Sequence, residues 1–420
     1  MATTDASALL KERYPESAFS AVPESAIVQK AIGLFKKALV GKKFVLPVRL
    51  TAESGFTYAK LSDGGITLQE AGPAVTADAE IDPGQIYELV QVNYADISRA
   101  PSGGAQAVEG ANDWALKGGL LSMRRRVETN LINGGTALGH VQSIATVGSD
   151  RVLTIVTGDF APGIWVGAEA NTPVNAFEED GTPINVDAVL LVKGVNSLTR
   201  AVTVSGDASD LTALSTYVAA NPGDCQIWYQ TAFNGTTIKE SLGLAAIAAN
   251  ATTLFGINGA VYSLYHGNEQ DVGGALTKEA VDAGLSMAVD KGLDMPGVLL
   301  ISNRSWGSLS AELASVRRLD GSYLKSKGIV GQKAISIVSQ NGELEVMPSN
   351  FVREGEAYFF APEECMRIGS RDVALGLPNM DEVVYPVPGT NYAQAGLMTD
   401  QALFTMTPAH MVKFTGIVNS

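Results

Sequence analysis

The sequence predicts an α+β protein of several domains, and three stretches of the chain predict it. Residues 101–135 have the pattern of one long helix. Residues 137–233 carry six short β runs separated by turn residues, and residues 241–333 alternate between helix and strand patterns. At 420 residues the chain is long enough for two or three domains, each with a core of its own.

The composition excludes some classes of function. Hydrophobic residues make up 46% of the chain and charged residues only 18%, and the net charge is −14. Because such a molecule repels phosphate groups, we do not expect sequence-specific binding of nucleic acid. The sequence has no apolar run of about 18 residues and no basic region before an apolar segment at its start, so we expect neither a membrane span nor a secretion signal.

The first 40 residues are predicted to form an arm. Residues 26–40 have a helical pattern through Ile27, Ala31 and Leu34. This helix either docks on its own domain or straps onto a neighbouring molecule, and the sequence leaves both alternatives open.

Residues 41–84 are predicted to form an extended β loop. Phe44, Leu46 and Val48 alternate with other positions in a strand pattern, and Pro47 does not suit a central strand. Because the segment has too little apolar surface to bury alone, we expect it to lie on another surface. A further strand pattern, over residues 86–100, leads into the long helix.

The long helix is predicted to be a strut laid across a thin sheet. Its second half places four apolar residues on one face: Leu120, Met123, Val127 and Leu131. Arg124, Arg125 and Glu128 fall on the other side, and Gly134-Gly135 suits the end of the helix. A helix of about 30 residues is roughly 45 Å long.

The six β runs predict a separate β-rich insertion, either a barrel or a sandwich. The runs are HVQSIATV, RVLTIVTG, GIWVGAEA, AVLLVKGV, RAVTVSG and QIWYQ. A competing helical pattern covers residues 210–220.

The region after the insertion predicts an α/β layer. Residues 276–293 have a helical pattern that Thr277 can cap, and the apolar run GVLLISN suits a buried strand. Ser302 or Asn303 can cap the next helix. The dipeptide Asn341-Gly342 predicts the turn of a hairpin.

Two late strand patterns, over residues 356–371 and 402–418, need a sheet partner. The strand over residues 86–97 is available for that role. We therefore expect the first third and the last quarter of the chain to build one domain together.

Few residues suggest catalysis or metal binding. The three histidines, His140, His266 and His410, lack the spacing of a zinc site and are expected to have ordinary hydrogen-bonded or surface roles. The sequence has no nucleophile elbow and no phosphate-binding loop motif. We therefore predict that the chain is not an enzyme and has no catalytic residue, cofactor or metal.

Other polar groups are also given structural roles. The acidic runs Glu178-Glu179-Asp180 and Glu363-Glu364 stand in turn-like settings and are interpreted as solvated carboxylates, although they could also be an acid and a base. Cys225 and Cys365 are expected to be buried free thiols, with a disulfide as the alternative.

The densest basic run is Arg124-Arg125-Arg126. Arginine grips carboxylates as well as phosphates, and the rest of the chain is acidic, so we expect these residues to face a neighbouring subunit. Nucleic-acid contact and a solvated helix face are the alternatives. Arg317-Arg318, at the end of a predicted helix, repeats the pattern and is a second candidate for a subunit interface.

This order of segments resembles that of the major capsid proteins of tailed bacteriophages, which have the Hong Kong 97-type fold. The stretch KKFVLPVRLTAESGFTYAKLSDGGITLQEAG looks like their extended loop, and PSGGAQAVEGANDWALKGGLLSMRRRVETNLINGG looks like their spine helix. The resemblance implies six segments: an N-terminal arm (1–40), an extended loop (41–84), a peripheral domain with the spine helix (85–136), a β-rich insertion domain (137–235), an axial α/β domain (236–349) and C-terminal strands of the peripheral domain (350–420).

The function that the resemblance implies is mechanical. Copies would associate as hexamers and pentamers into an icosahedral shell that encloses double-stranded DNA in the virion, without sequence-specific binding and without a membrane. Scaffolding, portal and decoration proteins are further possible partners. Some members crosslink a lysine of the extended loop to an asparagine of a neighbour; Lys60 lies in that segment, so it is a candidate interface residue, but no asparagine here can be matched to the partner.

Three rival functions remain open from the sequence. An encapsulin-type compartment shares the fold and encloses cargo enzymes, but the β insertion argues against it. An α/β enzyme with a β accessory domain would have its site after GVLLISN, at Ser302, Asn303 and Ser305. A tail or host-recognition protein would form trimers or fibres.

Overall fold

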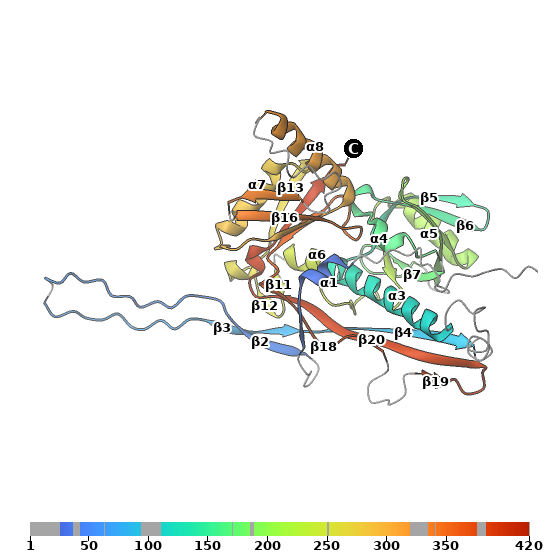
Figure 1. Cartoon of the computed structure of the whole chain (residues 1–420), viewed down its shortest axis with the longest axis horizontal. Helices are drawn as coiled ribbons and strands as arrows, with labels where there is room; N and C mark the ends of the chain where they lie inside the picture. The colour runs from blue at the N-terminus through green and yellow to red at the C-terminus, as the bar shows by residue number, and fades with distance from the viewer. Residues whose placement is uncertain are drawn as a thin grey trace, which may run out of the picture. The chain divides into compact units, whose positions relative to one another are not determined.

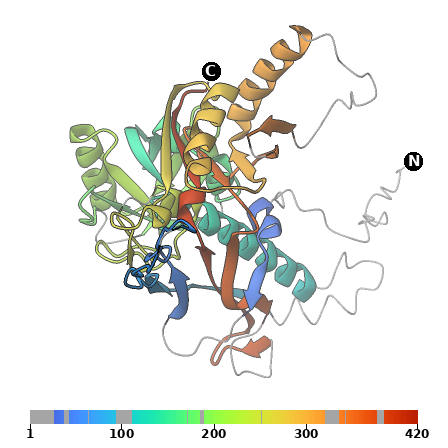
Figure 2. The ribbon, with the colours of Figure 1, turned by 90° about the vertical axis from the view of Figure 1, so that its left-hand side faces the viewer.

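The computed structural model describes residues 26–36, 43–62, 64–93, 111–169, 171–184, 189–249, 252–319, 335–340, 342–375 and 384–419 (Figures 1 and 2). The chain divides into two compact units. The smaller comprises residues 85–127 and 371–400 together with the first 26 residues, and the larger comprises residues 27–84, 128–370 and 401–420.

A thin sheet covered by a helix forms the smaller unit. Its strands are β4 (Gly84–Asn93), β19 (Val384–Pro386) and most of β20 (Tyr392–Thr405), and both β4 and β19 pair with β20. Residues 401–405 of β20 belong to the larger unit. The helix is α3 (Ala111–Asn133). Gly119 of α3 lies so close to Val90 and Leu397 that a Cβ atom added there would be 2.6 Å from both side chains. The helix therefore lies directly on the sheet, as a strut across a thin sheet would.

The end of α3 follows its sequence signals. The Gly134 amide bonds the Asn130 carbonyl at 2.8 Å, and Gly135 has a φ of 82°, the left-handed conformation that glycine tolerates. Met123 is buried, as are the two apolar residues predicted after it. Glu128, which we assigned to the polar face, is fully buried, so that assignment is wrong. Residues 101–110 of the predicted helix lie outside the described part of the chain.

The predicted N-terminal helix is shorter than expected. In the larger unit, α1 (Ile27–Ala31) ends before Gly33, and β1 (Leu34–Lys36) follows as a strand that pairs in parallel with β18 (Cys365–Leu375). The expectation of a helix through residue 40 is therefore wrong for residues 34–36. Pairing with a sheet outweighed the helical period there, because glycine interrupts the helix and frees the next residues for the strand edge.

The predicted β loop begins and ends in a two-stranded sheet. Strands β2 (Phe44–Arg49) and β3 (Thr76–Ile81) are antiparallel, from the pair Phe44↔Ile81 to the pair Arg49↔Thr76. Pro47 is accommodated because the sheet of β2 and β3 has no third strand.

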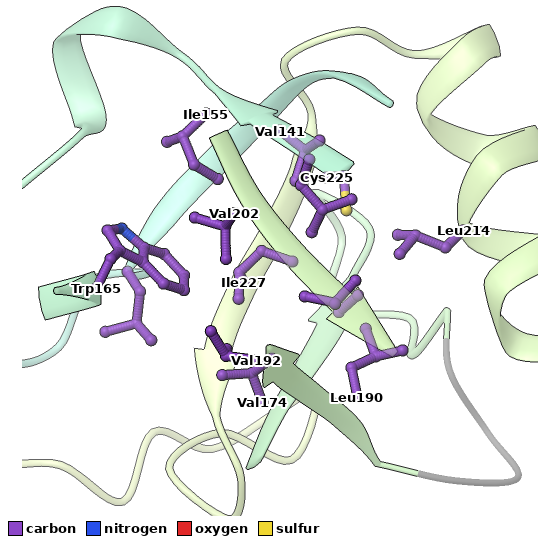
Figure 3. Close-up of a cluster of buried hydrophobic side chains, with 14 of the residues drawn as sticks. Val141, Ile155, Trp165, Val174, Leu190, Val192, Val202, Leu214, Cys225 and Ile227 are labelled. Atoms are coloured by element: carbon purple, nitrogen blue, oxygen red, sulfur yellow. The ribbon is translucent and has the colours of Figure 1, made fainter. Parts of the chain in front are cut away.

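The predicted β-rich insertion is a closed barrel with the strand order β10-β5-β6-β9-β8-β7. The strands are β5 (Gly139–Val147), β6 (Asp150–Ile155), β7 (Thr172–Phe177), β8 (Leu190–Asn196), β9 (Ala201–Ser205) and β10 (Cys225–Tyr229). The helix α5 (Ala208–Ala220) matches the pattern seen at residues 210–220. Figure 3 shows aliphatic side chains from opposite strands meeting inside the barrel, with Leu214 of α5 and Trp165 at its sides.

One barrel strand lies outside the run that predicts it. The run GIWVGAEA begins within the short helix α4 (Pro162–Trp165), which follows the 3-10 turn η3 (Thr157–Asp159), and the strand in its place is β7. Pro162 occupies the first turn of α4, where its missing amide costs nothing, and Ile164 and Trp165 of this helix are buried in the barrel core.

A six-stranded sheet forms another part of the larger unit, in the order β13-β21-β17-β14-β16-β15. The strands are β13 (Asn268–Gly274), β14 (Val298–Ile301), β15 (Ile335–Ser339), β16 (Gly342–Pro348), β17 (Ala357–Phe360) and β21 (Val412–Ile417). Two helices accompany it, α7 (Lys278–Val289) and α8 (Asn303–Leu319). Gly284 of α7 would meet the ring of Phe414 if it had a Cβ, so α7 packs closely on β21.

Local sequence signals in this domain are confirmed. Thr277 caps α7 by accepting a hydrogen bond from the Ala280 amide, and all of β14 is buried. Ser302 accepts a hydrogen bond from the Ser305 amide at the start of α8. The hairpin of β15 and β16 pairs Ser339 with Gly342, which has a φ of 105°.

The expected partners of the late strands are only partly right. The strand β20 pairs with β4 as expected, but β17 and β21 pair with β14 and β13 in the six-stranded sheet. The reason is burial: β17 is buried along its whole length, which suits a central strand and not one in a sheet with a solvated face. The remaining short elements are α6 (Leu244–Ala248), β11 (Thr253–Leu254), β12 (Ile257–Asn258), η4 (Ser263–Tyr265) and η6 (Pro408–His410). No helix among the described residues is long and apolar enough to cross a membrane.

Candidate functional site

The ribbon between β2 and β3, residues 50–75, exposes large apolar side chains. Tyr58 is 94% exposed and Leu68 is 78% exposed, and three others in the ribbon are at least half exposed: Phe56, Leu61 and Ile66. The two sides of the ribbon are held by backbone contacts, such as the mutual hydrogen bonds of Ser54 and Gly72 at 2.8 and 3.1 Å. A soluble protein seldom leaves this much apolar surface bare in one segment, so the ribbon is a candidate interface. Lys60 lies in this ribbon and is exposed.

A buried carboxylate holds helix α1. Glu128 of α3 accepts hydrogen bonds from the amides of Val28 at 2.8 Å and Gln29 at 3.0 Å, the free amides at the start of α1. Burial raises the pKa of Glu128, although these amide hydrogen bonds oppose the rise. Arg367 donates to the Ile32 carbonyl at 2.9 Å. Residues 26–32 therefore dock on their own chain, the first of the two alternatives for this helix. Residues 1–25 of the predicted arm lie outside the described part of the chain.

The arginine run of α3 is partly used within the smaller unit. Arg124 is exposed, whereas Arg125 and Arg126 are half-buried. Burial raises the pKa of Glu88 on β4 to about 7, and the positive charge of Arg126 opposes that rise. Arg126 therefore lies near Glu88, and Arg124 has the most exposed side chain of the three.

The other predicted basic pair, Arg317-Arg318, lies in the last turn of α8. Their side chains lie outside the described atoms. The six candidate interface residues thus come from three separate elements: the ribbon, α3 and α8.

A buried seam joins the barrel to the six-stranded sheet. It consists of residues 349–356, between β16 and β17, and its backbone bonds the barrel in three places. The Gly163 amide donates to the Asn350 carbonyl at 2.7 Å, the Glu354 amide to the Phe160 carbonyl at 3.0 Å, and the Gly355 amide to the Gly158 carbonyl at 2.8 Å.

Buried ion pairs reinforce this seam. The carboxylate of Glu354 is 2% exposed and lies 2.8 Å from Arg200, in the turn between β8 and β9, and 3.1 Å from Arg304 of α8. One carboxylate thus links the barrel to a helix of the α/β domain. No local sequence pattern marks this group because its members are scattered, with Arg200 and Glu354 separated by 154 positions.

A second buried group lies beside it. The Glu356 carboxylate lies 2.8 Å from the Lys413 ammonium and 3.6 Å from the Arg353 guanidinium, and it accepts a hydrogen bond from the Tyr358 hydroxyl. Burial alone would raise the pKa of Glu356, but the positive charges of Arg353 and Lys413 outweigh it and lower the pKa. Arg353 also donates to the Thr136 hydroxyl at 2.8 Å, just before the first barrel strand. These contacts make the barrel a firmly attached part of the larger unit.

Two of the three histidines, His140 and His410, face carboxylates. His140 lies 2.5 Å from Asp159; burial raises the pKa of Asp159, but the His140 hydrogen bond and the charge of Arg353 outweigh it and lower the pKa. His410 lies 2.8 Å from Glu364, which raises the pKa of His410.

Chemistry of other kinds finds little support in the described part of the chain. No group of three or more metal-ligating side chains occurs there. Cys225 and Cys365 are buried free thiols, and burial raises the pKa of each to about 12, so neither is a reactive thiolate at neutral pH. Ser302 and Ser305, the residues of the rival enzyme site, bond each other at 2.8 Å and form the cap of α8.

One family model matches part of the chain. Residues 225–367 match the model of the SU10 major capsid protein. The match begins in the last barrel strand and ends in β18. No curated protein sequence matches the chain.

Three solved structures are similar over nearly the whole chain. The capsid asymmetric unit of cyanophage A-1(L) has a TM-score of 0.57 at 11% identity, with 98% of this chain and 98% of that chain covered. The capsid of the native GTA particle has a TM-score of 0.54 at 8% identity, with 99% of this chain and 98% of that chain covered. The capsid of cyanophage P-SCSP1u has a TM-score of 0.50 at 9% identity, with 100% and 96% covered. At such identities the likeness shows the fold, and it confirms the predicted Hong Kong 97-type fold.

Proposed function

We infer from the family match and the capsid fold together that this chain is a major capsid protein of a tailed bacteriophage, whose copies form the icosahedral shell of the virion. Such a protein is structural, so the chain is not an enzyme. The resemblance found in the sequence is confirmed at this level.

The ribbon of residues 50–75 docks on an adjacent copy. Its exposed aromatic and aliphatic side chains have no core of their own, and a neighbouring subunit offers a surface that is present wherever the protein assembles. Each such side chain contributes roughly 1.5–3 kcal/mol when it is buried. Docking of the ribbon therefore lowers the free energy of the assembled state and contributes almost nothing to the stability of the separate subunit.

Copies associate as hexamers and pentamers, and the arginines of α3 and α8 support their contacts. Arg124, Arg125 and Arg126, together with Arg317 and Arg318, pair with carboxylates of neighbouring copies, since the net charge of −14 provides many acidic partners. Lys60 contributes to the contact made by the ribbon. The same acidic charge lets the shell enclose double-stranded DNA without gripping it. Scaffolding, portal and decoration proteins are possible further partners.

The barrel is an insertion domain in the capsid fold. The family match begins at Cys225, so it leaves most of the barrel outside, and the barrel has a hydrophobic core of its own. The six segments predicted from the sequence describe the chain under this proposal, except that β17 and β21 extend the axial sheet. Because the seam attaches the barrel firmly, the barrel moves with the axial domain during assembly.

The proposal is tested by assembly of the full-length protein. We expect the wild type to form closed particles in negative-stain images and to sediment as large assemblies. The double variant Tyr58→Ser/Leu68→Ser should remain as small species, because it removes apolar contacts of the ribbon. Val147→Ser, which changes an exposed residue of the barrel, is the matched control and should assemble normally. Trimers or fibres from the wild type would contradict the proposal.

The contents of the particles separate this function from an encapsulin-type compartment, the second candidate. Particles purified from infected cells should contain double-stranded DNA. Particles filled with a cargo enzyme and free of DNA would favour the compartment.

A further inference from the structure

A small turn supports the base of the ribbon. The hairpin of β11 and β12 pairs Thr253 with Asn258 and Leu254 with Ile257, and Figure 1 shows it beside β3. The carbonyl of Phe255, in its turn, accepts a hydrogen bond from the Glu80 amide of β3 at 2.8 Å. The hairpin thus contacts the outer edge of the strand from which the ribbon extends.

The turn has an unusual residue in a strained conformation. Both central residues have positive φ, 50° for Phe255 and 81° for Gly256, which is the geometry of a two-residue turn that favours Asn-Gly. A bulky side chain in this region costs about 1–2 kcal/mol. Glycine adopts a positive φ without strain, so Gly256 suits its position. Phe255 does not, and its presence requires a separate explanation.

The ring of Phe255 supplies that explanation. It is only 8% exposed, and its centroid lies 5.4 Å from that of Phe404 on β20. Leu254 and Ile257, on either side of the turn, are also buried. Packing of the ring offsets the backbone strain and fixes the carbonyl that faces Glu80. The turn therefore ties β3 to a strand of a different sheet.

A small movement at the base of the ribbon becomes a large displacement at its far end. The ribbon continues beyond β2 and β3 for about a dozen residues on each side, or about 40 Å at 3.3 Å per residue. A rotation of about 5° at the base would displace the far end by roughly 3.5 Å. This is about the distance between two carbon atoms in van der Waals contact. Contacts at the far end hence depend on how firmly the base is held.

We propose that the Phe255-Gly256 turn is a positioning element that sets the direction of the ribbon, so that its exposed side chains reach their site on the adjacent copy. Phe255 acts by two contacts, its ring on Phe404 and its carbonyl on the Glu80 amide. This inference rests on the proposed docking of the ribbon, since the direction matters only if the ribbon binds a defined surface.

The test uses two variants of the full-length protein and a control. Phe255→Gly keeps the positive φ without strain and removes the ring, whereas Phe255→Tyr keeps the ring. Leu198→Gly, in the turn between β8 and β9, removes an exposed apolar side chain from a comparable turn. Hydrogen exchange of the Glu80 amide is measured before assembly, with the buried strand β14 as an internal check that the protein is folded.

We expect the Glu80 amide to exchange about tenfold faster in Phe255→Gly than in the wild type, with β14 unchanged. The yield of closed shells should fall in the same variant, and Phe255→Tyr and Leu198→Gly should match the wild type in both measurements. Unchanged exchange at Glu80 in Phe255→Gly would overturn the inference, as would normal shell yield despite faster exchange.

The two proposals can fail separately. If the wild type formed no shells, the proposed function would be contradicted, whereas exchange at Glu80 would still decide whether the turn holds the base of the ribbon.

Discussion

The ribbon and the barrel are both β structures that leave the main sheets, yet they satisfy their side chains in opposite ways. The barrel closes on itself and buries a cluster of aliphatic residues from all six strands, with Trp165 at its side (Figure 3). The ribbon has two strands at its base and leaves Tyr58 and Leu68 largely exposed. The barrel is thus complete within one molecule, and the ribbon is complete only when something covers it.

The ionic contacts of the two regions differ in the same direction. Glu354 at the seam of the barrel is 2% exposed and faces two arginines. At the start of the ribbon, Arg49 of β2 and Glu53 lie 3.6 Å apart with 59% and 67% of their side chains exposed. Water screens this pair far more than the group at Glu354, so the group at Glu354 should contribute more to stability. Burial, and not the number of contacts, separates the part that stabilises the subunit from the part that awaits a partner.

The largest expected effect comes from breaking the seam. Glu354→Gln removes the negative charge that Arg200 and Arg304 share, and it should lower the free energy of unfolding by about 2–4 kcal/mol, because two partly buried cations lose their buried partner. Denaturant unfolding of the unassembled protein measures this loss. The matched control is Glu53→Gln in the ribbon, which should cost less than about 0.5 kcal/mol. Equal losses in the two variants would contradict the contrast between the regions.

A smaller effect is expected from His410, which belongs to the completed part of the molecule. Its Nδ1 faces the Glu364 carboxylate and its Nε2 lies 3.3 Å from the Lys291 carbonyl, so both nitrogens face acceptors and the ring is best satisfied as the cation. The hydrogen bond to Glu364 raises the pKa of His410, and the charge of Asp294 acts in the same direction.

The raised pKa gives the pH dependence a definite sign. Because the folded pKa of His410 lies above its unfolded value of 6.5, its contribution is fully present below pH 6.5 and is lost as the pH rises through the folded pKa. His410→Gln should lower stability by about 1.5–3 kcal/mol at pH 5.5, and by less at pH 9. Thermal unfolding at both pH values measures the difference. A loss that is the same at both values would show that the charge of His410 has no role.

The smallest effect on stability is expected in the ribbon. Phe56→Ser/Leu61→Ser changes side chains that already face water, so the free energy of unfolding of the unassembled protein should change by no more than about 0.5 kcal/mol. Denaturant unfolding checks this value. Truncation of a core side chain typically lowers the free energy of unfolding by about 2 kcal/mol or more. A loss of that size here would mean that the ribbon packs on its own subunit.

Features with local causes could be predicted from the sequence. The turn at Gly342 and the cap at Thr277 depend on neighbouring residues, and both are where the sequence placed them. The alternating pattern through Phe44, Leu46 and Val48 likewise coincides with β2. Order along the chain was then enough to suggest the capsid fold.

Features with distant causes could not be predicted. The helical period around Leu34 was outweighed by pairing with β18, whose residues are more than 330 positions away. Glu128 looked like a surface residue until its partners, the amides of α1, were in place. The seam at Glu354 depends on charges from three separate elements. Of the candidate interface residues, the arginines of α3 and α8 stay predictions, since neighbouring copies decide their role.

The central claim is that the ribbon becomes ordered against an adjacent copy. Hydrogen exchange of residues 51–75, measured in the unassembled protein and in closed shells, tests this claim most directly. We expect fast exchange in the unassembled protein and strong protection in the shell, while the barrel strands stay protected in both. Equal protection of the ribbon in the two states would contradict the account.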